Sequence, residues 1–283
     1  MILLSTGALR FYGLDRVFSI AADLGFDGVE VIVDARWDTT DPLYLMRLSE
    51  RYGLPIPSVH SPFSFVEISA WGNDPSARMR NSIRLAEELG SELVVIHLPF
   101  FAERHYGRWV DEDLPRAQEM TRVKIAVENM PEAYKILGSL GVRLNTGVFY
   151  AADRGRPVNM LLRFLSRPCF PGNNWDYLLR FRHLVLDTTH LATGGGDPIK
   201  AYQKMKSKLA LIHLSNFDGK EHTPLGEGSI DFPRFLRHLR DDGYGGHVSI
   251  ELMPDHFPDG TEPTARRILA DNLALCRECL YNI

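Results

Sequence analysis

Six acidic or histidine residues share one position in this sequence: each ends a short apolar run. These runs are rich in Val, Ile and Leu, such as 93–96 and 184–186. The six residues are His60, His97, Glu128, Asp187, His213 and Glu251. In a parallel sheet that is buried on both faces, apolar side chains fill the middle of each strand, so a polar group at its carboxyl end needs a partner. Three imidazoles and three carboxylates that converge there form a set of metal ligands.

Strand-like runs alternate with amphipathic helical stretches along the whole chain. The runs begin near Ile2, Gly28, Ile56, Leu93, Lys124, His183, Leu209 and His247. Such an α/β pattern leaves two architectures, a closed (β/α)8 barrel and an open doubly wound sheet. An open sheet binds its ligand at one switch point, whereas polar residues here end six successive strands. The sequence also has no GxGxxG motif and no P-loop, so nothing supports an open nucleotide-binding sheet. The pattern therefore predicts a single-domain TIM barrel over residues 1–283, with these residues on its active-site face.

One interval between strands is abnormally long. About 55 residues separate Glu128 from the next strand, which predicts an insertion over residues 141–182 between strands 5 and 6. This segment carries seven arginines, seven aromatic residues and two aspartates. Arginine suits phosphate, and an aromatic ring can stack on a base or a sugar, so the insertion can cover the active site. Alternatively, it packs on its own aromatic residues or forms the contact of a homo-oligomer.

Composition excludes several classes of protein. The 283 residues are 45% apolar and 24% charged, with a formal net charge of −4, so nothing attracts the whole chain to nucleic acid or an anionic membrane. No apolar span of 18 residues occurs, and the chain begins with a strand-like run, so we expect no membrane anchor and no signal peptide. Cys276 and Cys279 lack a second cysteine pair, which favours helix packing over zinc or redox chemistry. We expect a cytoplasmic enzyme.

Two further segments lead to a family resemblance. His190 follows Asp187 by three residues, and the segments 216–222 and 225–228 follow His213. With them, the chain resembles the xylose isomerase-like TIM barrels, a superfamily of sugar isomerases, sugar epimerases and endonuclease IV-type apurinic endonucleases. The resemblance covers nearly the whole chain, through the motifs Phe26-Asp27-Gly28-Val29-Glu30, Val59-His60-Ser61-Pro62, Val127-Glu128-Asn129 and Ile250-Glu251.

The resemblance implies a divalent metal ion. Its four ligands, shared by the epimerases and the endonucleases, would be Glu128, Asp187, His213 and Glu251. A mixed nitrogen and oxygen set suits Zn²⁺, Mn²⁺, Co²⁺ or Fe²⁺, and Mg²⁺ less well. His60 and His97 match the endonuclease positions that hold another zinc, bridged to the first by Glu128. Alternatively, these two histidines are hydrogen-bonded residues that line the pocket.

The chain departs from the endonuclease pattern at the third zinc. His190 and His222 match two of its ligands, but Lys220 replaces the carboxylate two residues before His222, and a protonated lysine repels a cation. Asp218 could substitute only with a different loop shape. This departure puts a trinuclear site in doubt and leaves a mononuclear or dinuclear one. Lys220 and Asp218 are instead candidate substrate contacts, as is Glu30, which could also be an acid inside the barrel behind the ligands.

Three functions follow from these residues. In a metal-dependent isomerase or epimerase of a sugar or sugar phosphate, Glu128 and Glu251 would exchange a proton beside a carbonyl, and His190 would orient the substrate. In a zinc-dependent endonuclease, the same site would hydrolyse DNA at abasic positions, which the histidines and the arginine-rich insertion favour. A non-catalytic metabolite-binding barrel is the third, although an intact ligand set argues against it. The acidic composition and Lys220 favour the isomerase.

Overall fold

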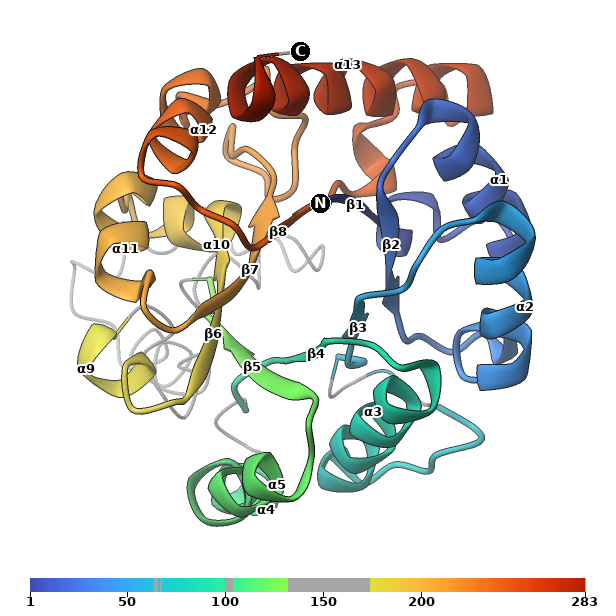
Figure 1. Cartoon of the computed structure of the whole chain (residues 1–283), viewed down its shortest axis with the longest axis vertical. Helices are drawn as coiled ribbons and strands as arrows, with labels where there is room; N and C mark the ends of the chain where they lie inside the picture. Colours follow the sequence, from blue (N-terminus) through green and yellow to red (C-terminus); the bar gives the residue numbers. More distant parts are fainter. Residues whose placement is uncertain (64–65, 67, 100–103, 132–173, 283) are drawn as a thin grey trace, which may run out of the picture.

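The computed structural model describes residues 1–63, 66, 68–99, 104–131 and 174–282, and these fold as a closed parallel barrel (Figure 1). Its strands are β1 Ile2–Ser5, β2 Gly28–Ile32, β3 Ser58–His60, β4 Leu93–Ile96, β5 Lys124–Glu128, β6 His183–Asp187, β7 Leu209–Leu214 and β8 His247–Ile250. Each strand pairs in parallel with the next, and β8 pairs with β1. The predicted TIM barrel is thus confirmed.

The strand starts agree closely with the prediction. Seven of the eight strands begin at the predicted residue, and β3 begins at Ser58 instead of near Ile56. Pro55 and Pro57 explain the later start, because proline has no N–H to donate to a neighbouring strand. The carbonyl of Pro57 still accepts hydrogen bonds from the backbone N–H groups of Glu92 and Leu93, so the chain is already aligned with β4 there.

Helices surround the barrel in Figure 1. They are α1 Leu14–Leu24, α2 Pro42–Tyr52, α3 Pro75–Leu89, α4 Arg104–Arg108, α5 Leu114–Met120, α9 Trp175–Leu178, α10 Thr188–Thr193, α11 Pro198–Met205, α12 Phe232–Asp241 and α13 Glu262–Tyr281. Several begin with an aspartate whose carboxylate caps the helix and a proline in the first turn, as at Asp41, Asp74 and Asp197. Such starts fix where each helix leaves its loop.

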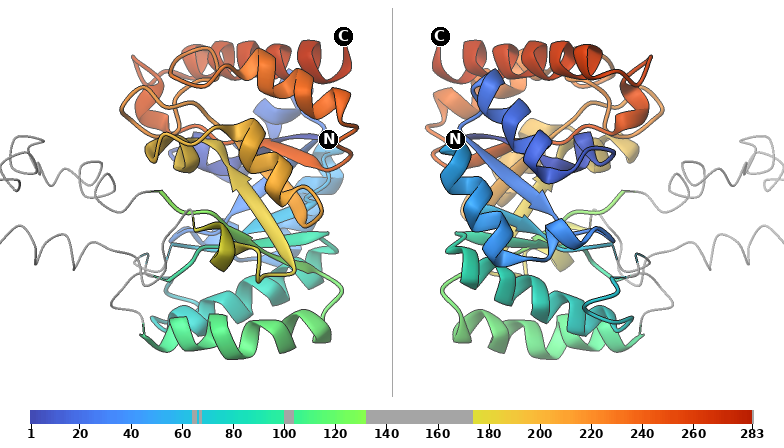
Figure 2. Two further views of the ribbon diagram at one scale, coloured as in Figure 1. Left: turned by 90° about the vertical axis from the view of Figure 1, so that its left-hand side faces the viewer. Right: turned by 90° about the vertical axis from the view of Figure 1, so that its right-hand side faces the viewer.

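The last helix closes the outer ring. In the side views of Figure 2, α13 runs along the outside of the barrel beside α12, and it also contacts α1. Its inner face buries Cys276 and Cys279 as free thiols, which agrees with a packing role for both. Among the described helices, none combines the length and apolarity that a membrane span requires.

Apolar side chains fill the described interior of the barrel below the polar residues at its carboxyl end. This cluster comprises Leu3, Leu93, Val95, Ala126, Val185, Ala210 and Leu211. Because side chains along a strand alternate between its two faces, the residue two positions after an inward apolar residue also points inward. His97, Glu128, Asp187 and His213 follow Val95, Ala126, Val185 and Leu211 by two residues. The strand period therefore stacks the polar layer directly on the apolar one.

The predicted insertion over residues 141–182 falls mostly outside the described residues. Residues 141–173 lie outside the described part of the chain, while 174–182 include α9 and lead into β6. Coverage of the barrel mouth by this segment, or an oligomer contact through it, stays a prediction.

Gly28 tests how closely the strands and loops pack. A Cβ atom there would lie 2.9 Å from the carbonyl oxygen of Pro55 and 3.1 Å from Cδ2 of Leu3. We expect Gly28→Ala to lower the free energy of unfolding in urea by about 1–3 kcal/mol, since overpacking forces the backbone to shift. Gly245→Ala is the control, because nothing lies within 4 Å of its added Cβ. Equal unfolding free energies for the two variants would contradict this packing.

Candidate metal centre

Four predicted ligands meet at the carboxyl end of the barrel. Glu128, Asp187 and His213 end or lie near the end of β5, β6 and β7, and Glu251 directly follows β8. Each offers one ligand atom, and these four atoms all lie within 4.8 Å of one another. His213 Nδ1 lies 3.1 Å from Glu128 Oε1, 3.0 Å from Glu251 Oε2 and 3.8 Å from Asp187 Oδ2. One imidazole nitrogen thus faces three carboxylates.

Glu128 also belongs to a second group. Its other oxygen, Oε2, lies 3.3 Å from His60 Nε2 and 2.9 Å from His97 Nε2. His60 Nδ1 lies 2.8 Å from the carbonyl oxygen of Ser61 and donates its hydrogen there, so Nε2 is the nitrogen that faces Glu128. The two oxygens of Glu128 therefore face different groups, which is the arrangement of a bridging ligand.

A third group joins Asp187 to two histidines. Asp187, His190 and His222 offer ligand atoms that lie within 4.8 Å of one another. Asp187 caps α10, and its Oδ1 accepts a hydrogen bond of 2.7 Å from the backbone N–H of His190, so the first helical turn brings His190 back towards it. His222 has the left-handed φ of 57°, and its backbone N–H donates to Thr189 Oγ1. The predicted ligands all fall in these three groups.

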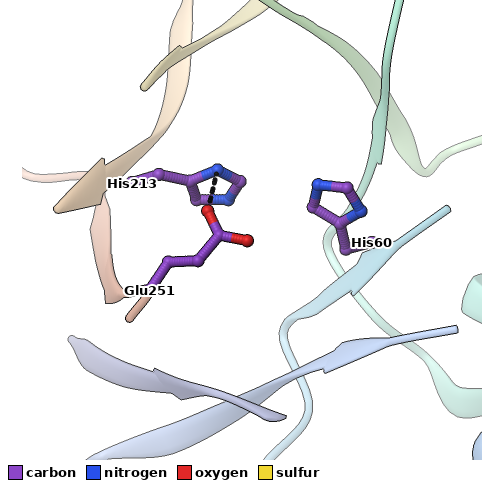
Figure 3. A group of neighbouring side chains, drawn as sticks. All are labelled: His60, His213 and Glu251. Carbon is purple, nitrogen blue, oxygen red and sulfur yellow. Dashed lines mark ion pairs between the residues drawn. The ribbon is translucent and has the colours of Figure 1, made fainter. Parts of the chain in front are cut away.

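The groups are not separate in space. Figure 3 shows the rings of His60 and His213 with the carboxylate of Glu251 directed at His213. The two rings are stacked with centroids 5.5 Å apart, and His60, His213 and Glu251 themselves offer ligand atoms within 4.8 Å of one another. The site is therefore one connected set of donors that shares Glu128 and Asp187.

Three candidate substrate residues belong to none of these donor groups. Lys220 and Asp218 are exposed in the loop after β7, where the backbone N–H of Lys220 donates to Asp218 Oδ1 at 3.0 Å. Neither belongs to a donor group, so Asp187 supplies the carboxylate of the third group. Glu30 is fully buried, with Oε1 3.1 Å from His213 Nε2, and so lies behind a predicted ligand. Contact of any of the three with a substrate stays a prediction.

The donor set fits a divalent cation. Asp187 Oδ2, Glu251 Oε2 and His97 Nδ1 are buried and make no hydrogen bond of acceptable geometry within the described residues, although Glu251 Oε2 lies beside His213. Buried carboxylate oxygens without donors cost free energy, and a cation removes that cost. Carboxylate oxygens mixed with imidazole nitrogens suit Zn²⁺, Mn²⁺, Co²⁺ or Fe²⁺.

Protons compensate the buried carboxylates in the metal-free protein. Burial raises the pKa of Asp187 to about 6. Burial lowers the pKa of His190, but Asp187 and Glu128 outweigh it and raise that pKa to about 10. For His213, Glu251, Glu30 and Glu128 likewise outweigh burial and raise its pKa well above the ordinary value. The imidazoles thus hold the positive charge that a bound cation would replace.

Two features of the site were not predicted from the sequence. Asn129 joins β5 to β6, because its side chain donates to the carbonyl of Asp187 at 3.1 Å and accepts from the N–H of Asp187 at 2.7 Å. Its position after Glu128 was the only available signal, since the partner lies 58 residues away.

A cavity of about 440 Å³ between the loops after β2 and β3 is lined by residues 35–38, 40 and 68–70, including the exposed Trp37.

The family follows from a sequence match. The xylose isomerase-like TIM barrel family matches residues 18–279. The chain belongs to this family. An uncharacterized protein of Mycobacterium leprae is 30% identical over 98% of this chain and 96% of its own length. L-Ribulose-5-phosphate 3-epimerase UlaE of Shigella flexneri is 25% identical over 85% of this chain and 82% of its own length.

Two solved structures have the same fold as this chain. A D-tagatose 3-epimerase-like protein superposes with a TM-score of 0.64 at 22% identity and covers 98% of both chains. A family 2 AP endonuclease from Brucella melitensis superposes with a TM-score of 0.61 at 14% identity, over 96% of this chain and 98% of its own. Both likenesses concern the fold, since the identities are low.

Metal affinity should rise with pH. A cation must displace the protons that His190 and His213 hold in the metal-free protein, because their pKa values are raised. Between about pH 6 and 8, we expect the apparent Zn²⁺ affinity to rise about tenfold per pH unit for each displaced proton. Calorimetric titration in buffers of different ionisation enthalpy measures both the affinity and the protons released. An affinity independent of pH, without proton release, would contradict this expectation.

Proposed function

We propose that the protein is a divalent-metal-dependent epimerase or isomerase of a sugar or sugar phosphate. The observation that carries this proposal is the pair of carboxylates, Glu128 and Glu251, that lie 3.1 Å and 3.0 Å from the same nitrogen of His213. A substrate bound beside a metal ion at this point would have both carboxylates close to its reacting carbon. The names of the similar proteins, a D-tagatose 3-epimerase-like protein and an L-ribulose-5-phosphate 3-epimerase, support the same chemistry.

The proposed reaction replaces one proton on a substrate carbon with another. When bound, the metal ion polarises the substrate carbonyl and so acidifies the hydrogen on the neighbouring carbon. One of Glu128 and Glu251 removes that proton as the base, and the other returns a proton to the carbon. His190, whose ring lies 3.3 Å from Glu128 Oε1, orients the substrate oxygen. Burial of these groups keeps bulk water away from the reacting carbon.

Hydrolysis of DNA at abasic sites is the second candidate. The three donor groups that share Glu128 and Asp187 favour it, as does the fold shared with a family 2 AP endonuclease. The loops after β1 and β2 argue against it, because Arg10 pairs with Asp255 and Arg36 with Asp34. DNA binding needs an excess of cations, and the net charge is −4. The arginine-rich part of the insertion lies outside the described residues.

Solvent deuterium distinguishes the two reactions. We expect the metal-loaded protein to interconvert D-tagatose or L-ribulose 5-phosphate with its epimer in D₂O, with deuterium at the epimerised carbon. Glu128→Gln and Glu251→Gln should each lower kcat by at least about 10²-fold, since each removes a proton-transfer group; metal analysis of each variant separates lost ligation from lost proton transfer. Incision of an abasic duplex at catalytic rates, abolished by His60→Ala and without deuterium exchange, would put the endonuclease first.

Lys220 is proposed to contact an anionic group of the substrate. Its ammonium is an exposed charge on the loop that carries His222, with three donors that suit a phosphate. We expect Lys220→Ala to leave the bound metal unchanged and to raise KM for a phosphorylated sugar about tenfold, with no change for the unphosphorylated sugar. Lys124→Ala is the control, because this exposed lysine begins β5 at the opposite end of the barrel. An equal KM effect on both sugars would contradict the contact.

A further inference from the structure

Glu30 is the centre of a buried polar network beneath the metal ligands. It lies on β2, is fully buried and has no direct place in any of the donor groups. Its Oε2 accepts a hydrogen bond of 2.6 Å from Ser58 Oγ, and its Oε1 accepts one of 3.1 Å from Ser249 Oγ. The third partner is His213, whose Nε2 lies 3.1 Å from Oε1 and 3.3 Å from Oε2. Hydroxyl and imidazole donors thus surround this carboxylate.

The pairing of the strands places the residues of this network next to one another. Ser58 on β3 pairs directly with Glu30 on β2, and Ser249 on β8 pairs directly with His213 on β7. Each hydroxyl therefore comes from a residue that the sheet already holds next to one member of the Glu30–His213 pair. A buried carboxylate is costly without donors, and these two serines supply them from strands that cannot move independently.

The contact decides which nitrogen of His213 is available. A carboxylate accepts hydrogen bonds, so Nε2 of His213 carries the hydrogen that points at Glu30. The other nitrogen, Nδ1, faces the carboxylates of Glu128 and Glu251. A histidine binds a cation only through a nitrogen without hydrogen, and a carboxylate on its opposite nitrogen fixes both the tautomer and the direction of the ring.

We infer that Glu30 is a positioning residue of the metal centre, which holds His213 so that Nδ1 is the nitrogen offered to the cation. Ser58 and Ser249 in turn hold Glu30. This inference rests on the metal dependence of the proposed function. It assigns Glu30 a role that acts through His213.

The test compares Zn²⁺ affinity across variants by competition with a chelator. We expect Glu30→Leu to weaken zinc binding about 10–100-fold, as is usual when the outer partner of a ligating histidine is lost. Glu30→Gln keeps an acceptor of nearly the same shape, so its loss should be smaller, as should the losses in Ser58→Ala and Ser249→Ala. Ser5→Ala is the matched control and should bind zinc like the wild type. Ser5 is buried, pairs with Glu30 across β1 and β2, and its hydroxyl has no partner among the described residues.

A spectroscopic reading separates positioning from general loosening of the barrel. In the ¹⁵N-histidine spectrum, the Nε2–H proton of His213 should be protected from solvent exchange in the wild type and in Ser5→Ala. It should exchange faster in Glu30→Leu and in Glu30→Gln. His213→Asn assigns the signal by its loss. If Glu30→Leu does not fold, zinc affinity and proton exchange in Glu30→Gln still test the inference.

The outcomes are distinct. Zinc affinity and exchange in the Glu30 variants equal to those of the wild type would overturn the inference, as would an equal loss in Ser5→Ala. If the wild type binds none of Zn²⁺, Mn²⁺, Co²⁺ and Fe²⁺, the metal dependence of the proposed function fails instead. The exchange of the His213 proton in the metal-free protein then still decides whether Glu30 holds the ring.

Discussion

The burial of three carboxylates around one nitrogen of His213 is the constraint on which this site depends. Glu128, Asp187 and Glu251 are removed from water, and like charges held so close repel each other unless positive charge lies between them. Protonated imidazoles supply that charge in the metal-free protein, as the raised pKa values of His190 and His213 indicate. A divalent cation would supply it more effectively, because Glu128, Asp187 and Glu251 could each offer it an oxygen. The same repulsion therefore accounts for both the protonation of the histidines and the suitability of the site for a metal.

The barrel supports this cluster through geometry that is fixed before any ligand arrives. The apolar layer of Val95, Ala126, Val185 and Leu211 fills the space below the ligands, so their side chains cannot withdraw into the barrel. Strand pairing fixes the height of each ligand, and Asn129 ties the backbone of β5 to that of β6 at Asp187. The cap that Asp187 forms on α10 then brings His190 to the same carboxylate. The side chain of Asp187 thus both caps α10 and positions His190.

Shared ligands explain how one architecture accommodates different chemistry. Glu128 joins the central donor group to that of His60 and His97, and Asp187 joins the same central group to that of His190 and His222. The cluster could therefore hold more than one cation. Proton transfer beside a carbonyl and hydrolysis of a phosphodiester both use such a centre, and they differ in what approaches it. The charges on the surrounding loops then indicate which of the two substrates, a sugar or DNA, can approach the site. In the loops after β1 and β2, the arginines are paired with aspartates, which is more compatible with a small substrate than with DNA.

The sequence by itself determined the barrel and placed the candidate metal-binding residues at its strand ends, because both follow from local periodicity: an apolar run ended by one polar residue, repeated on six strands. It also indicated the metal, since those residue types have few other uses when buried together. Only the tertiary structure decided how these residues are shared and held. Lys220 suggested an incomplete third group, yet closure of the barrel brings Asp187 to His222, 35 positions away in the numbering. Glu30 meets Ser249 across 219 residues and Asn129 meets Asp187 across 58. Such contacts depend on strand register around a closed ring, and no local pattern encodes that register.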